Sequence, residues 1–268
     1  MLQKHQPIGI FDSGIGGLTV ANAILAHLPQ EEIIYFGDTA HLPYGDKSAD
    51  AIRYYCLKIA KFLMEKDCKM IVVACNSASS VGYEVLLEFF QEQLLFANVV
   101  DPLVEVALSV PYQKIGIIAT KATINSGVYQ AKLKQEGAHL SVAAMATPLL
   151  APMIEEGFVH NRISDVVLDT YLGSPDFKDI DALLLACTHY PLIKPDIEQY
   201  FKHRVKVYDS GALVARQVAQ QLQAHHLLNE QSTPPQHKFY ISDYTRSFEE
   251  TARRFYTHRI DLEYCNIW

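Results

Sequence analysis

Two short stretches decide the fold: VACNS at residues 73–77 and LACTH at residues 185–189. Each follows a run of apolar residues typical of a buried strand, and the small polar residues after it can begin a helix. The segment IGIFDS at residues 8–13 is echoed in the same way by IGIIAT at residues 115–120. The two echoes indicate that the chain contains two similar halves.

Alternating apolar strands and amphipathic helices predict parallel βαβ units with helices on both faces of each sheet. In the first half we expect strands at 8–11, 33–36 and 70–74 and helices at 17–28, 48–66 and 79–94. The matching strands of the second half are expected at 114–119, 141–144 and 183–186. After them, the pattern predicts a helix at 211–228, a polar loop, a strand at 238–242 and a last helix.

These elements predict an α/β fold with two similar three-layer domains, whose mainly parallel sheets are related by pseudo-twofold symmetry. The tail after residue 209 is too small to form a third domain, so we expect it to pack back on the first half. The first predicted domain comprises residues 1–97 and 209–268, and the second comprises residues 98–208. Because parallel sheets bind ligands outside the carboxyl ends of their strands, we expect the active site in the cleft between the domains.

The composition argues against several classes of partner. The chain has 268 residues with 23 basic and 30 acidic side chains, a formal charge of -7, which offers no basic surface to nucleic acid or anionic lipid. Its apolar runs are too short to span a bilayer, and the amino-terminal run is too short for a signal peptide. The five cysteines lack the spacing of a zinc site or a disulfide framework. We therefore expect a cytoplasmic protein with reduced thiols and no metal.

Cys75 and Cys187 are the candidate catalytic residues because each follows a strand and precedes the start of a helix. A helix amino terminus can lower the pKa of a thiol from about 8.5 and favour the reactive thiolate. Either cysteine alone is equally well explained as a small buried residue of the core. Two matched thiols that flank one cleft suit the inversion of a carbon centre, since one can remove a proton while the other delivers one to the opposite face. No pattern suggests a pyridoxal-binding lysine, so no cofactor is expected.

The motifs around these cysteines resemble those of the glutamate racemases of bacterial cell-wall synthesis, in the aspartate/glutamate racemase superfamily. The resemblance covers nearly the whole chain and rests on FDSGIGG at 11–17, GDT at 37–39, PYG at 43–45, ACNSAS at 74–79, ACTHYP at 186–191 and DSG at 209–211. Three positions depart from the usual family pattern. Ser77 replaces a common threonine, His41 a frequent arginine, and VDPL at 100–103 a usual glutamate and glycine.

The resemblance implies an isomerase that interconverts L- and D-glutamate without a cofactor and supplies D-glutamate for peptidoglycan, and thus for cell shape. It implies that Cys75 deprotonates D-glutamate and Cys187 deprotonates L-glutamate, with Asp12 and His189 assisting the thiols. The implied substrate contacts are Asp12, Ser13, Tyr44, Gly45, Asn76, Ser77, Thr120, Thr123, Thr188 and His189. The oligomeric state is left open, with a homodimer as one option.

The residues beside the thiols also have ordinary interpretations. Asp12 would serve equally as a helix cap before the glycine-rich turn, and His189 as a polar loop residue. The hydroxyl and amide residues are common in turns and caps. The other cysteines, Cys56, Cys68 and Cys265, match no catalytic motif and are interpreted as structural.

Four other functions stay open from the residues alone. A dinucleotide-binding oxidoreductase would use the glycines at 14, 16 and 17 with Asp38 as the ribose-binding acid, although Thr19 stands at the third glycine position of that fingerprint. A related two-cysteine racemase could act on aspartate or a hydantoin, although the PYG segment favours glutamate. A non-catalytic amino-acid-binding protein leaves the paired thiols unexplained. A metal site at Cys187 and His189 would have only two ligands.

Overall fold

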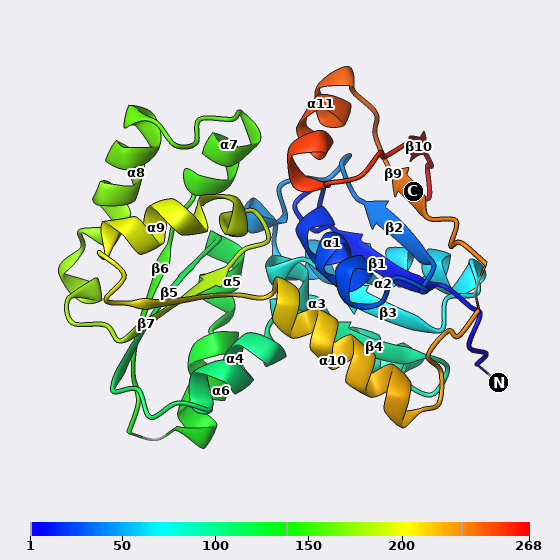
Figure 1. Ribbon diagram of the computed structural model, residues 1–268, viewed down its shortest axis with the longest axis horizontal. Helices are drawn as coiled ribbons and strands as arrows, with labels where there is room; N and C mark the ends of the chain where they lie inside the picture. Colours follow the sequence, from blue (N-terminus) through cyan, green and yellow to red (C-terminus); the bar gives the residue numbers. More distant parts are fainter. Residues whose placement is uncertain (1, 138, 232) are drawn as a thin grey trace.

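The computed structural model describes residues 2–137, 139–231 and 233–268. Two parallel sheets, each covered by helices, lie side by side (Figure 1). The first sheet has six strands in the order β10-β9-β2-β1-β3-β4, and the second has four in the order β6-β5-β7-β8. The predicted α/β class, with two domains built on parallel sheets, is therefore confirmed.

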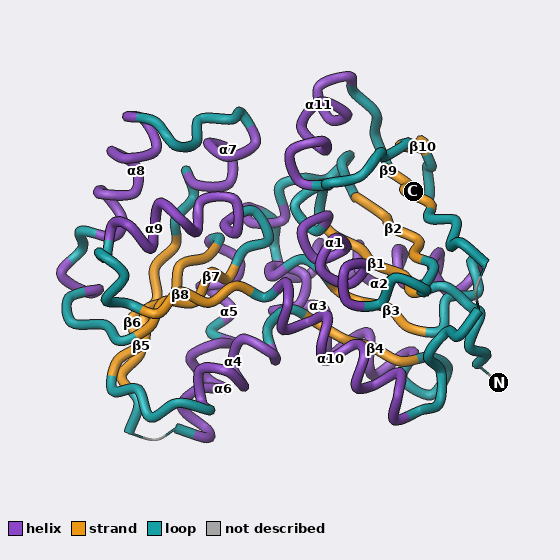
Figure 2. The backbone as a smooth tube through the Cα atoms, in the orientation of Figure 1, coloured by secondary structure: helices purple, strands orange, loops and turns teal. Residues whose placement is uncertain are grey.

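The strands and helices of the two domains alternate along most of the chain (Figure 2). The strands of the first sheet are β1 (Ile8–Asp12), β2 (Ile33–Gly37), β3 (Met70–Val73), β4 (Leu95–Asn98), β9 (Lys238–Ile241) and β10 (Leu262–Tyr264). The helices around it are α1 (Leu18–His27), α2 (Ala49–Glu65), α3 (Asn76–Phe90), α10 (Gly211–Ala224) and α11 (Arg246–Phe255), with the 3-10 helix η1 (Tyr44–Asp46).

The second sheet is surrounded by shorter helices. Its strands are β5 (Lys114–Ala119), β6 (Ser141–Ala146), β7 (Ala182–Ala186) and β8 (Lys206–Asp209). Its helices are α4 (Asp101–Leu108), α5 (Lys121–Ser126), α6 (Val128–Glu136), α7 (Leu150–Glu155), α8 (Arg162–Leu172) and α9 (Lys194–Tyr200), with the 3-10 helices η2 (Pro175–Phe177) and η3 (Tyr190–Ile193).

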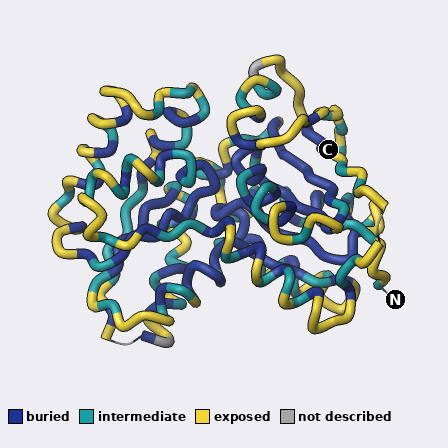
Figure 3. Tube along the Cα trace, in the orientation of Figure 1, coloured by how far each residue is buried: buried dark blue, intermediate teal, exposed yellow. Residues whose placement is uncertain are grey.

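Central strands of both sheets are buried along their whole length (Figure 3). β1 lies between β2 and β3, and its echo β5 lies in the same way between β6 and β7. β3 lies between β1 and β4, and its echo β7 lies between β5 and β8. Helices cover both faces of such a sheet, which explains why these strands are continuously apolar instead of alternating. The echoed segments of the sequence therefore occupy equivalent central positions in the two sheets.

The tail of the chain returns to the first sheet. β9 pairs with β2, β10 pairs with β9, and α10 packs against α1. The domain boundaries proposed from the sequence stay a prediction; β4 ends at Asn98 and β8 at Asp209, each one residue past a predicted boundary.

One predicted helix begins too late. α3 starts at Asn76 instead of residue 79, because the Sγ of Cys75 accepts a hydrogen bond from the Ala78 N–H at 3.5 Å and caps the helix. It ends at Phe90 because β4, which the sequence did not reveal, begins at Leu95. Among the described residues, no helix combines the length and the apolar character needed to cross a membrane.

Candidate active site

A cavity of about 260 Å³ lies where the carboxyl ends of the two sheets face each other. Its size is slightly below the range of about 300–1,000 Å³ that is common for drug-sized ligands, so it suits a small metabolite. It is lined by Asp12, Ser13, Gly14, Leu42, Pro43, Tyr44, Gly45, Cys75, Asn76, Ser77, Thr120, Ala151, Pro152, Glu155, Cys187, Thr188 and His189. The cavity thus brings together every candidate residue from the sequence except Thr123.

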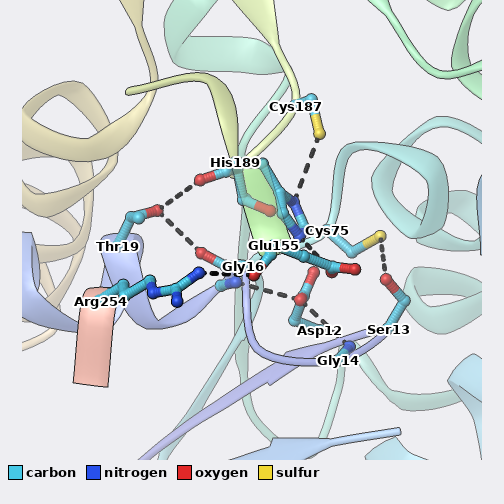
Figure 4. Close-up of polar contacts among 12 residues, drawn as sticks. Asp12, Ser13, Gly14, Gly16, Thr19, Cys75, Glu155, Cys187, His189 and Arg254 are labelled. Carbon is cyan, nitrogen blue, oxygen red and sulfur yellow. Dashed lines mark hydrogen bonds and ion pairs between the residues drawn. The ribbon is translucent and has the colours of Figure 1, made fainter. Parts of the chain in front are cut away.

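Cys75 lies at the end of β3 and is 5% exposed. Its thiol donates to the Ser13 hydroxyl across 3.7 Å, as Figure 4 shows. Burial raises the pKa of Cys75 to about 12, and the charge of Asp12 adds to this effect, while the Ala78 N–H and Ser13 oppose it. The prediction that the helix amino terminus lowers the pKa of Cys75 is therefore wrong, because desolvation of the thiol outweighs the hydrogen bond from the backbone donor.

Cys187 follows β7 in the second domain and has a histidine beside it. Its Sγ lies 3.6 Å from Nδ1 of His189, and Nε2 of His189 lies 2.7 Å from Oε1 of Glu155 (Figure 4). Burial alone would lower the pKa of His189, but its interactions with Cys187 and Glu155 outweigh burial and raise this pKa well above 6.5. Both neighbours therefore favour the protonated imidazole, which in that form can donate to the sulfur and to the carboxylate.

Glu155 was not identified from the sequence. It ends α7, 34 residues before His189, and no local motif marks it. Arg254 of α11 donates to the Glu155 backbone carbonyl at 2.8 Å, so a helix of the first domain contacts the end of α7 (Figure 4). Its contact with His189 lies within the second domain and depends on how α7 packs beside the end of β7, which the sequence does not show.

Asp12 ends β1 and is 1% exposed. Its Oδ2 accepts from the N–H groups of Gly14 and Gly17 at 3.2 and 3.0 Å, whereas its buried Oδ1 has no partner among the described residues. Burial raises the pKa of Asp12, against the charge of His189 and the backbone donors. Asp12 is therefore not the cap of α1, whose N-cap is Gly17 without a side-chain cap bond. It stabilises the glycine-rich turn through one oxygen and leaves the other without a partner beside the cavity.

Hydroxyl and amide groups connect the domains beside the thiols. The hydroxyls of Ser77 and Thr120 lie 2.8 Å apart, and Thr120 donates to Thr123, which lies buried behind it at 3.1 Å. The phenol of Tyr129 in α6 donates to Oδ1 of Asn76 at 2.6 Å, and Nδ2 of Asn76 has no partner among the described residues. Asn76 thus has a free amide donor in the wall of the cavity.

The glycine-rich turn does not leave room for a pyrophosphate. A Cβ on Gly16 would lie 2.4 Å from the His189 ring and 2.6 Å from the Thr188 hydroxyl. Asp38, the candidate ribose-binding acid, is fully buried and accepts from Tyr44 and Ser242 at 2.6 and 2.7 Å. Gly16 therefore allows the close approach of His189, and the dinucleotide hypothesis loses both of its supports.

The chain is similar to known racemases in sequence and in fold. The family model described as Asp/Glu/Hydantoin racemase matches residues 18–218. A glutamate racemase of Geobacter metallireducens is 40% identical over 249 residues, which cover 92% of each chain. A glutamate racemase of Chlorobaculum parvum is 39% identical over 255 residues, covering 95% of this chain and 93% of the relative. The crystal structure of glutamate racemase from Francisella tularensis in complex with D-glutamate has a TM-score of 0.93 at 35% identity, with 98% of each chain covered.

Proposed function

Because the chain belongs to the Asp/Glu/hydantoin racemase family, we propose that it interconverts L- and D-glutamate, with Cys75 and Cys187 as the two acid/base groups and without a cofactor. One observation carries this proposal: two thiols at the ends of β3 and β7, in different domains, line the same 260 Å³ cavity. Opposed groups of this kind are what inversion at Cα needs.

The proton transfers balance in each direction. The thiolate of Cys75 removes the α-proton of D-glutamate, and the thiol of Cys187 delivers a proton to the opposite face of Cα. The product is L-glutamate, with Cys75 protonated and Cys187 as thiolate, which is the state that deprotonates L-glutamate. Return to the starting state needs only the reverse turnover or proton exchange with solvent.

The α-proton of an amino acid is weakly acidic, so the site has to stabilise the developing charge. The free Oδ1 of Asp12 is suited to the substrate ammonium, and an ammonium held there would oppose the burial that raises the pKa of Cys75. The protonated His189 would stabilise the thiolate of Cys187 from 3.6 Å away. Each thiol thus has a nearby group that favours its ionised form during turnover.

Neutral donors suit the carboxylates of the substrate. Nδ2 of Asn76 and the hydroxyls of Ser13, Ser77, Thr120 and Thr188 are available for the amino-acid end. The Tyr44–Gly45 turn, which lines the same cavity, would take the side-chain carboxylate through its backbone N–H groups. Thr123 would act on the substrate only through Thr120, since it does not line the cavity.

The wider setting also belongs to the proposal. We expect D-glutamate made by this enzyme in the cytoplasm to enter peptidoglycan synthesis. A homodimer remains one option for the assembly. Aspartate or a hydantoin is the alternative substrate within the same family.

Exchange in deuterated water tests the proposal. Purified protein with L-glutamate and no added cofactor or metal should form D-glutamate that carries deuterium at Cα, measured by polarimetry and mass spectrometry. Cys75→Ala and Cys187→Ala should each abolish racemisation, whereas Cys265→Ala should not. Exchange into aspartate or a hydantoin but not glutamate would reassign the substrate, and full activity in Cys187→Ala would reject the two-thiol mechanism.

A further inference from the structure

His41, the residue that departs from the family pattern, is linked to the cavity through Asp38. Nδ1 of His41 lies 2.9 and 3.0 Å from the two carboxylate oxygens of Asp38. The phenol of Tyr44 donates to Oδ2 of the same carboxylate at 2.6 Å. Asp38 is fully buried, so the position of Tyr44 depends on how this carboxylate is held.

The ring of His41 is itself held between two aromatic side chains. It stacks on Tyr55 of α2 with a centroid distance of 4.3 Å and an interplanar angle of 24°. Trp268 meets it edge to face at 4.4 Å and 79°, and also contacts Tyr55 at 5.4 Å. Trp268 therefore covers a ring that, at 27% side-chain exposure, would otherwise be open on that side.

The carboxyl-terminal segment holds the same loop at a second point. Ser242, which follows β9, donates to Oδ1 of Asp38 at 2.7 Å and accepts from the Ala40 N–H at 3.0 Å. The Thr39 hydroxyl accepts from the Asp243 N–H at 2.8 Å. With Trp268, these contacts fix residues 38–41 from both sides.

The turn that follows this loop has little freedom. Tyr44 is fully buried, and a Cβ on Gly45 would lie 2.9 Å from Cβ of Thr120 in the other domain. The Tyr44–Gly45 turn is thus positioned by Asp38 on one side and lies close to Thr120 on the other. Small displacements of such a turn change how well its backbone donors align with a bound group.

We propose that His41 and Trp268 are positioning residues that hold the Tyr44–Gly45 turn in place for the side-chain carboxylate of the substrate. The inference rests on the proposed glutamate racemase function. His41 fixes the Asp38 carboxylate by its hydrogen bond, and Trp268 fixes His41 by covering its ring.

The role has a specific kinetic signature. In the proposed binding mode the turn contacts the side-chain carboxylate and not the exchanging Cα proton, so its contacts are the same in the ground state and the transition state. Loss of such uniform binding raises KM and leaves kcat unchanged. A purely structural role would instead lower the amount of active enzyme, seen as a lower kcat at unchanged KM.

The test compares KM and kcat of purified variants for both enantiomers. His41→Ala should raise KM about tenfold, as expected for a lost hydrogen bond to a charged group, with kcat within about twofold of wild type. Trp268→Ala removes only the ring that covers His41, so it should raise KM in the same direction and by no more, again with little change in kcat. Trp268→Phe should restore most of the affinity, because an edge-to-face ring remains. His41→Phe keeps the stacking but not the donor, and should resemble His41→Ala. The KM of the double alanine variant should be no higher than the higher KM of the two single alanine variants.

Tyr264→Ala is the matched control, because it removes a 61% exposed aromatic side chain from the same terminal segment. Its KM should stay at the wild-type value. Wild-type KM in His41→Ala, His41→Phe or Trp268→Ala, or a loss of kcat alone, overturns the inference. If an alanine variant does not fold, His41→Phe decides the matter by the same criterion. Absence of glutamate racemisation in the wild type would instead reject the proposed function.

Discussion

The Sγ of Cys187 lies 3.6 Å from Nδ1 of His189, whose other nitrogen lies 2.7 Å from Glu155. The histidine therefore lies between a thiol and a carboxylate, and its raised pKa follows from both. This arrangement has consequences that can be measured separately from those at Cys75.

His189→Asn should lower kcat/KM about 100-fold, because the thiolate of Cys187 loses its neighbouring imidazolium. The two enantiomers have equal free energies, so kcat/KM must fall equally in both directions. Deuterium kinetic isotope effects should show which proton transfer is impaired. The isotope effect should become larger for 2-deuterated L-glutamate than for 2-deuterated D-glutamate, because Cys187 is the proposed base for the L-enantiomer. His160→Asn, which removes an exposed histidine paired with Asp196 at 2.8 Å, is the control and should leave these values unchanged. Equal isotope effects for both enantiomers would argue against the role of His189 in stabilising the thiolate of Cys187.

The rate at which iodoacetamide alkylates the thiol of Cys75 should have an unusual pH dependence. Its pKa is raised to about 12 by burial, and only the thiolate is alkylated. Between pH 7 and 10, the alkylation rate of Cys75 in the folded protein should therefore keep rising about tenfold per pH unit. Mass spectrometry of the Cys75 peptide measures this rate. The same cysteine in urea-unfolded protein should level off near pH 9. A plateau near pH 8 in the folded protein would contradict the raised pKa.

Tyr129→Phe should affect both stability and binding. The phenol donates to Oδ1 of Asn76 at 2.6 Å inside the protein, and its loss leaves a buried acceptor without a partner. We expect urea denaturation to give a free energy of unfolding lower by about 1–3 kcal/mol. KM for glutamate should rise, because the Asn76 amide would no longer be fixed. Tyr112→Phe, which removes a 2.8 Å contact with Tyr208 away from the cavity, should leave KM unchanged. Unchanged KM in Tyr129→Phe would show that Asn76 needs no such support.

Lys69→Met should destabilise the first domain strongly. Nζ of Lys69 lies 2.6 Å from Oε2 of Glu31 and also donates to the carbonyl of Leu227 at 2.9 Å, and both charged side chains are almost fully buried. Removing one partner of a buried pair leaves an uncompensated charge and costs about 3–5 kcal/mol. Thermal or urea unfolding would measure this loss.

A surface ion pair provides the comparison. Lys61→Met breaks an exposed pair with Glu65 at 3.9 Å and should cost no more than about 0.5 kcal/mol. Equal effects of the two substitutions would mean that the Lys69 pair contributes no more than a surface contact.

The sequence revealed much of the architecture because its signals are local. Continuous apolar runs mark buried parallel strands, and all the strands predicted from them are present within two residues at each end. The family was also correctly identified from short motifs. The strands that were missed, β4, β8 and β10, are short and lie at the edges of the sheets, where the apolar signal is weaker.

The sequence by itself thus determined the two-domain α/β fold, the strand ends that carry Cys75 and Cys187, and the family. The tertiary structure alone decided which distant groups hold the residues beside those thiols, with Glu155 next to His189 and Tyr129 next to Asn76. It also decided that the pKa of Cys75 is raised instead of lowered. The physical reason is that strand and helix patterns depend on neighbours along the chain, whereas desolvation and contacts between domains depend on how the finished elements pack.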